Sequence, residues 1–251
     1  MGFLADHFKR VSAARQAAAS VNPEATAAEQ EGRTQYERML LLLDTHQQQL
    51  RNTQSMEARA EMKAKLLPEY APYLDGLVEA GASQQDNVLV TLMLWHFDCA
   101  LIGSALALAE VALGSNMAMP EQHRRNLATV VVEETADLLL AGKGAQTPEE
   151  ALGYIDQADT MTTGRDMPDA VRAKLLKAKG RALRAVEFKE GEEAEAIARD
   201  EQALAVMKRA LDLDKSVGVK KDIEQLERQI KNAAKPDPVD ASASAGVGSG
   251  A

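Results

Sequence analysis

SQQDNVLVTLMLWHFDCALIGSALALAEVAL, residues 83–113, is the most apolar stretch of the chain and contains its only tryptophan and its only cysteine. In its first half the apolar residues recur at steps of three and four, which places them on one helical face: Val88, Leu89, Leu92, Trp95 and Cys99. Asp86, three residues after Ser83, predicts a capping box at the start of this helix. From Leu101 the pattern repeats with glycine, serine and alanine between the leucines, so a partner helix can approach closely. The stretch therefore predicts a buried helical hairpin in an all-α protein.

The composition of the whole chain agrees with this fold class. Only 4% of the 251 residues are aromatic, and residues that favour helices dominate. The formal net charge of −9 argues against nonspecific coating of nucleic acid by the whole chain, although a local basic face is compatible with it. A single cysteine in an apolar helix indicates a reducing compartment. Polar and charged residues interrupt every candidate membrane span, so we expect no membrane contact.

Residues 35–67 predict one long amphipathic helix. Its apolar residues follow a heptad-like spacing, and polar runs such as THQQQLRNTQS lie between them. The pattern fits an oligomerisation arm as well as it fits a surface helix that packs on its own domain. Pro68 and Pro72 follow. Because proline has no N–H group for a helical hydrogen bond, we expect the chain to break and change direction there.

The rest of the chain predicts further helices. One over 127–140 ends at Gly142, and the next begins with Thr147 as N-cap and Pro148 as its first residue. Residues 169–231 alternate small and large apolar residues as helix-hairpin repeats do, which predicts a tetratricopeptide-like region with Gly180 at a close-packing position. We expect four segments: an N-terminal helix and polar linker (1–34), a central helical domain (35–145), the tetratricopeptide-like region (146–234) and a disordered tail (235–251).

A basic stripe lies in the helix expected after residue 169. Its four cations step by three, four and three residues and share one face: Lys174, Lys177, Arg181 and Arg184. Such a stripe could bind DNA phosphates. The usual alternative is a solvated face, here matched by the acidic stretch 187–195.

Motifs for most chemistry are absent from the sequence. There is no phosphate-binding P-loop, no dinucleotide fingerprint and no nucleophile elbow, and no two of the four histidines have metal-ligand spacing. A nuclease needs several carboxylates that converge on one point. The best candidates are Glu133, Glu134 and Asp137 at helical spacing, with Asp98 approaching in space; acidic residues at this spacing are usually a solvated face.

Six motifs in order carry a family resemblance: QYERMLLLL, KLLPEYAPYLDGL, QDNVLVTLMLW, MPEQHRR, DMPDAVRAKL and GVKKDIEQLER. Together, over residues 35–231, the chain resembles the small terminase subunit of peduovirus-type temperate tailed phages with cohesive DNA ends. The resemblance implies a packaging subunit in the host cytoplasm that recognises the cohesive-end site on concatemeric phage DNA. It also implies delivery of that DNA to the large-subunit ATPase motor and assembly as a homo-oligomer, such as a ring. The family is also labelled terminase endonuclease.

Three functions are consistent with these observations. The first is a non-catalytic subunit that binds double-stranded DNA and needs no cofactor; its candidate phosphate contacts are Lys9, Arg10, Arg15, Arg124, Arg125, Lys174, Lys177, Arg181 and Arg184. For Arg124 and Arg125 the alternative is an ion pair with Glu121 or with the following helix. The second is an endonuclease that uses a divalent metal and the carboxylates of Asp98, Glu133, Glu134 and Asp137. The third is an adaptor that binds the terminase large subunit and touches no DNA.

Overall fold

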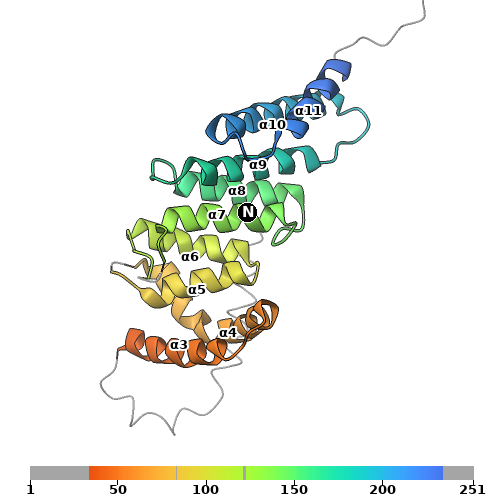
Figure 1. The fold of residues 1–251 in the computed structure, drawn as a ribbon. Helices are drawn as coiled ribbons and strands as arrows, with labels where there is room; N and C mark the ends of the chain where they lie inside the picture. Colours follow the sequence, from red (N-terminus) through yellow and green to blue (C-terminus); the bar gives the residue numbers. More distant parts are fainter. Residues whose placement is uncertain (1–33, 83, 121–122, 234–251) are drawn as a thin grey trace, which may run out of the picture.

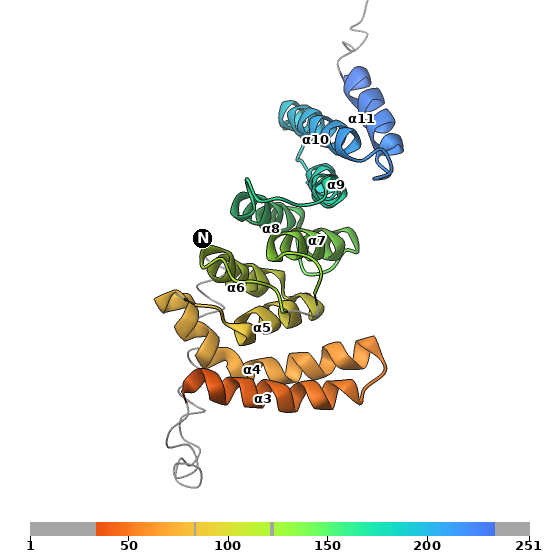
Figure 2. The same ribbon diagram turned by 60° about the vertical axis from the view of Figure 1, so that its left-hand side comes forward.

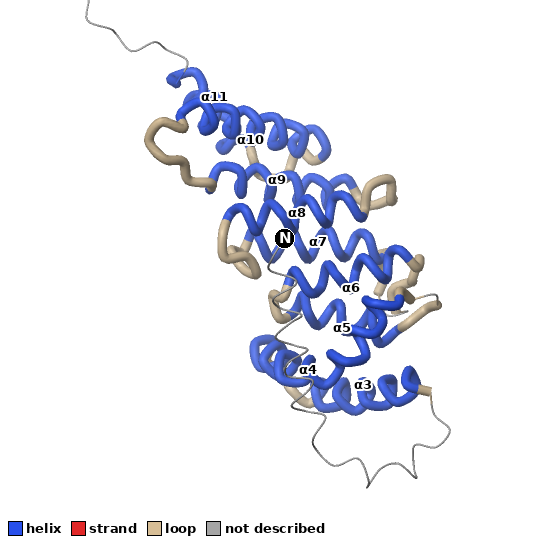
Figure 3. The backbone as a smooth tube through the Cα atoms, turned by 180° about the vertical axis from the view of Figure 1, so that it is seen from behind, coloured by secondary structure: helices blue, strands red, loops and turns tan. Residues whose placement is uncertain are grey.

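The computed structural model describes residues 34–82, 84–120 and 123–233, and within these residues it contains α-helices and no strand. Figures 1 and 3 show the helices and the loops that join them. The helices are α3 (Gln35–Arg51), α4 (Met56–Ala80), α5 (Asn87–Asp98), α6 (Ile102–Gly114), α7 (Leu127–Leu140), α8 (Pro148–Met161), α9 (Asp169–Ala185), α10 (Glu193–Leu213) and α11 (Lys220–Ala233). The all-α fold class is confirmed.

The helices stack along one axis, with α3 and α4 at one end and α11 at the other (Figures 1 and 2). Each packs on its neighbour in sequence, and α7 also packs on α9 while α6 packs on α8. A continuous apolar core runs through α3 to α8, and smaller apolar clusters join α7, α8 and α9 and then α9, α10 and α11. Such stacks are stabilised mainly between neighbours. The segment boundaries and the tetratricopeptide-like geometry stay predictions.

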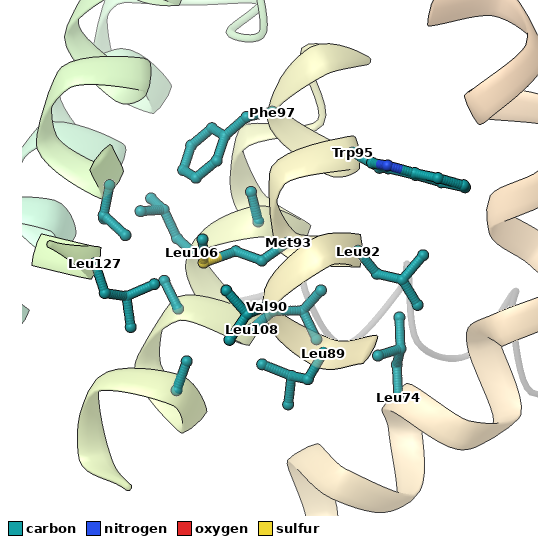
Figure 4. Packing of buried hydrophobic residues seen from close by; sticks show 14 of the residues in the cluster. Leu74, Leu89, Val90, Leu92, Met93, Trp95, Phe97, Leu106, Leu108 and Leu127 are labelled. Atoms are coloured by element: carbon teal, nitrogen blue, oxygen red, sulfur yellow. The ribbon is translucent and has the colours of Figure 1, made fainter. Parts of the chain in front are cut away.

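The expected hairpin forms the centre of the core as α5 and α6. Its largest side chains are almost completely buried, and they point to both sides of α5: Trp95 and Leu92 point toward α4, whereas Phe97 and Met93 point toward Leu106 (Figure 4). Asp86 is itself the N-cap of α5, because its carboxylate accepts a hydrogen bond from the Leu89 N–H at 2.8 Å. The hairpin places the final turn of α5, with Asp98, beside α7.

The single helix expected over 35–67 is wrong, because the chain turns back after Arg51. A capping box formed by Thr34 and Glu37 begins α3, and Ser55 caps the start of α4. The polar residues between the two helices stabilise a turn better than a helix, since their side chains bond to nearby backbone groups. Helix α3 packs on α4 and α5. This agrees with the expectation of a helix that packs on its own domain, and it leaves the oligomeric state open.

The expected break at the two prolines is also wrong, because both Pro68 and Pro72 lie inside α4. Four residues separate them, so the carbonyls left without a helical donor, those of Ala64 and Pro68, lie on one side of the helix. Both prolines are exposed, which leaves that side open to water. Helix α4 bends and continues (Figure 2).

Later boundaries follow the sequence closely. Thr147 caps α8 and Pro148 is its first residue, and Gly142 follows α7 with a positive φ of 69°. None of the helices in the described part of the chain is long and apolar enough to cross a membrane. The N-terminal helix expected before residue 34 and the disordered tail expected after 235 lie outside the described residues.

Candidate functional site

A polar pocket of about 520 Å³ opens where α3, α4, α5 and α7 meet the segment that precedes α7. Five of the predicted site residues converge here, although they are spread over residues 98–134 in sequence. Its lining consists of Gln47, Lys63, Thr91, Leu94, Trp95, Asp98, His123, Arg124, Arg125, Val130, Glu133 and Glu134. Candidate nuclease carboxylates and candidate DNA-binding arginines therefore share one site.

Glu133 lies between two cations. Its carboxylate forms an ion pair with Arg125, and the Nζ of Lys174 lies 3.4 Å from it on the other side. The same Nζ lies 3.0 Å from the carboxylate of Asp137, one turn further along α7. Lys174 on α9 thus links two carboxylates of α7. Arg125 pairs with the helix that follows it, which is one of the two ion pairs expected from the sequence as alternatives to DNA contact. Because Asp137 is not among the lining residues, the predicted carboxylates are only partly brought together.

Asp98 and Lys63 form the pocket's second ion pair. Asp98 is the last residue of α5, where the helix dipole disfavours a negative charge, so a nearby cation stabilises it. The Nζ of Lys63 also lies over the indole ring of Trp95, 5.8 Å from the ring centroid. The side chain of Lys63 is mostly buried, at 17% exposure, which makes this pair part of the packing between α4 and α5.

Glu134 differs from the other carboxylates of the pocket. Its side chain forms no ion pair or hydrogen bond with any residue in 34–82, 84–120 or 123–233. Burial raises the pKa of Glu134, and the negative charges of Asp98 and Asp137 raise it further, while Lys174 and Arg125 act in the opposite direction. Its charged form is therefore poorly compensated in the folded protein.

We expect the Glu134→Gln variant to be more stable than the parent chain at neutral pH, with the gain shrinking as the pH falls. The folded-state pKa of Glu134 is raised, so its ionised form opposes folding above that pKa. Protonation relieves this cost as the pH falls through the raised pKa toward the ordinary value. Urea unfolding of both proteins across the acidic range measures the difference. A gain that stays constant with pH would contradict the assignment.

The basic stripe of α9 is engaged with its neighbours in the stack. Lys174 bonds to α7 as described, and Lys177 donates a hydrogen bond of 2.8 Å to the backbone carbonyl of Val217. Arg181 and Arg184 lie 3.4 and 3.2 Å from the carboxylate of Asp222 on α11. The cations of the stripe therefore meet α7, the Val217 carbonyl before α11, and α11, and not the acidic residues 187–195. Whether the stripe also contacts DNA stays a prediction.

The remaining DNA-binding candidates differ in their surroundings. Arg124 is exposed and forms no ion pair with a described residue, and the side chain of Arg125 is 57% exposed despite its ion pair. Glu121, the other expected partner of this pair, lies outside the described residues, as do Lys9, Arg10 and Arg15. At the pocket rim, Arg124 is therefore the arginine most available to a ligand.

The residues of the pocket do not fit a divalent metal. No group of three or more histidine, cysteine, aspartate or glutamate side chains in the described parts of the chain is placed to hold one. Two of the three carboxylates that line the pocket already face lysine or arginine, whose positive charges disfavour a bound cation. The metal centre of the nuclease hypothesis has no ready ligand set here.

Sequence reasoning missed the residues that complete the pocket. Thr91, Trp95 and Asp98 follow one another at steps of four and three, which could have indicated that they share one face of α5. Lys63 carried no such signal, because its partner Asp98 lies 35 residues away in the chain.

Comparison with known proteins places the chain in a family. Residues 40–170, which include every residue that lines the pocket, match the model of the phage small terminase subunit. The "Terminase, endonuclease subunit" of Escherichia phage P2 is 38% identical over 234 residues, which cover 92% of this chain and 87% of that protein. The "Probable terminase, endonuclease subunit" of Haemophilus phage HP1 is 28% identical over 182 residues, covering 70% and 63%. No solved structure matches the chain. The family match, together with a relative aligned along most of its length, shows that the chain belongs to the phage small terminase subunit family.

Proposed function

We propose that the chain acts in phage DNA packaging as the subunit that binds the cohesive-end site of concatemeric DNA and presents it to the large-subunit ATPase motor. The observation that carries the proposal is membership of the small terminase subunit family. The sequence has no phosphate-binding P-loop, so ATP hydrolysis falls to the partner subunit. A homo-oligomer, arranged as a ring in the host cytoplasm, would place several weak DNA contacts on one duplex and raise its avidity.

Arg124 is the phosphate contact that the described structure favours. It lines the pocket in the segment before α7, is exposed, and forms no ion pair with a described residue, whereas Arg125 would first have to leave Glu133. The cations of α9 would likewise have to leave carboxylates or a backbone carbonyl of their neighbours before they could bind phosphate. Phosphate contacts position a protein on DNA, and base contacts provide specificity, so site recognition needs further residues.

The deciding experiment is binding of the purified chain to a duplex with the phage's cohesive-end region and to a scrambled duplex, at low and physiological salt. We expect a preference for the specific duplex that survives added salt. Equal binding that disappears with salt would show phosphate attraction only. The Arg124→Gln variant should reduce the slope of log affinity against log salt by about one. Arg209→Gln, at an exposed position of α10, is the matched control and should leave the slope unchanged.

A second candidate function is endonuclease activity of the chain itself, because the names of both relatives describe an endonuclease subunit. Asp98, Glu133 and Glu134 are the carboxylates in the pocket that such a site would use. The measurement is nicking of cohesive-end DNA with Mg²⁺ by the purified chain, by its Glu133→Gln variant and by its mixture with the large subunit. Cutting only in the mixture with the large subunit would contradict nuclease activity of the chain itself and would be consistent with the recognition role. Cutting by the chain alone, lost in the variant, would establish the nuclease.

The adaptor function predicts that DNA is not bound at all. Helical stacks of this kind often bind peptides along an extended surface, which is the observation that favours it. The purified chain should then bind neither duplex at either salt concentration, while removal of residues 169–231 should still end packaging. Binding of DNA that is lost together with packaging would favour the recognition role.

A further inference from the structure

We infer that the pocket between α4, α5 and α7 accepts an arginine side chain presented by a partner protein, with Glu134 as its carboxylate. This inference goes beyond DNA recognition and does not depend on it. The pocket contains the features that a guanidinium ligand needs, namely a carboxylate without an ion pair or hydrogen bond to a described residue, apolar walls for the side-chain stem and room for a side chain.

The charge arrangement leaves one carboxylate of the lining for an incoming cation. Of the three lysine and arginine side chains that line the pocket, Lys63 is paired with Asp98 and Arg125 with Glu133, while Arg124 is exposed and forms no ion pair with a described residue. A phosphate that entered the pocket would have to compete with Asp98 and Glu133 for the paired cations and would meet Glu134 as well, so Arg124 is the one cation of the lining that it would find without an ion pair to a described residue. An incoming guanidinium would meet the one carboxylate of the lining that forms no ion pair or hydrogen bond with a described residue. Burial of Glu134, which raises its pKa, makes a new cationic partner more valuable there than at an exposed surface.

The walls of the pocket suit the stem of an arginine. Leu94, Trp95 and Val130 line it, and Trp95 already has the ammonium group of Lys63 over its ring. Arginine combines a planar charged group, which can bond to a carboxylate through two N–H groups, with an apolar stem that packs on aromatic surface. Lysine lacks the planar fork, so arginine is the better match for a single carboxylate.

The test uses the full chain and the peptide acetyl-Ala-Arg-Ala-amide, titrated by calorimetry and by fluorescence of Trp95, the only tryptophan of the chain. Because Trp95 lines the pocket, its emission locates the bound peptide. We expect saturable binding with a dissociation constant of about 1 mM. The same peptide with citrulline, which is neutral and nearly isosteric, should bind at least about tenfold more weakly.

Three variants separate this inference from its competitors. Glu134→Gln should abolish the difference between the arginine and citrulline peptides, whereas Glu110→Gln at an exposed position of α6 should preserve it. Arg124→Gln removes a like charge from the lining and should strengthen binding of the arginine peptide, which is the opposite of its expected effect on DNA. Equal binding of the two peptides, or binding unaffected by Glu134→Gln, would overturn the inference. Saturable change on addition of inorganic phosphate, with none for the arginine peptide, would overturn it in favour of an anion site.

Discussion

Replacement of Tyr70 by alanine is expected to lower the free energy of unfolding by about 4 kcal/mol, close to the largest effect of a single core truncation. Tyr70 lies in α4 and is completely buried. Its hydroxyl lies 2.7 Å from Nδ1 of His46 on α3, and its ring packs edge-to-face on Trp95 of α5 at 6.2 Å between centroids. One side chain therefore joins three helices, so its removal leaves a cavity and takes away the hydrogen-bond partner of the buried Nδ1 of His46.

The Tyr70→Phe variant separates the ring from the hydroxyl. It keeps the packing on Trp95 but leaves the buried nitrogen of His46 without its partner, so we expect a loss of about 1–3 kcal/mol. Burial raises the pKa of Tyr70 above its usual value, which means that the phenol stays neutral and this hydrogen bond persists at alkaline pH. Urea unfolding of the three proteins, followed by helical circular dichroism, measures both steps. A loss below about 1 kcal/mol for Tyr70→Ala would contradict the proposed role of this side chain.

The central hairpin could be predicted from sequence because local periodicity defines a buried helical face. The apolar steps of α5 and the small residues of α6 specify both helices and their close approach, and the structure confirms them. Helix starts that have both a capping side chain and a proline at the first position, such as Thr147 followed by Pro148, could be predicted equally well. The turn between α3 and α4 was not, because its polar residues carry neither glycine nor proline. Pro68 and Pro72 predict an end to the helix where α4 only bends, since tertiary packing can carry a helix past prolines whose outer side faces water.

Only those residues of the pocket that share one helix could be predicted from the sequence. Residues on one helix, such as Glu133 and Asp137, share a face by spacing alone, which is why candidate carboxylates could be named. The cation that links them comes from another helix: Lys174 on α9 lies 37 residues beyond Asp137 in the chain. Periodicity shows which residues face outward from a helix, but the order of packing decides what each of them meets. The basic stripe of α9 illustrates this, because Asp222 of α11 takes the place that sequence proximity gave to residues 187–195.

Replacement of Gly180 by valine is expected to cost about 3 kcal/mol and to loosen the contact of α9 with α10. Gly180 is buried, and a Cβ atom there would lie 2.6 Å from Cγ of Met207, which is itself completely buried on the facing helix. The sequence indicated this close-packing position, and the structure confirms it. Thermal and urea unfolding of the variant measure the cost, and Gly180→Ala should show a smaller loss of about 1–2 kcal/mol.

Alanine substitutions at two helical glycines are expected to change the free energy of unfolding in opposite directions. Alanine favours helices over glycine by about 1 kcal/mol, so Gly→Ala inside a helix stabilises a protein wherever space allows. At Gly153 on α8 a Cβ atom meets nothing within 4 Å, and Gly153→Ala should raise the free energy of unfolding by about 0.5–1 kcal/mol. Gly180→Ala should lower the free energy of unfolding. In the double variant Gly180→Ala/Met207→Ala the loss should be smaller than the sum of the two single losses, because the smaller side chain at position 207 gives the new methyl group room. Stabilisation at both glycines would show that α9 and α10 do not approach as closely as the structure describes.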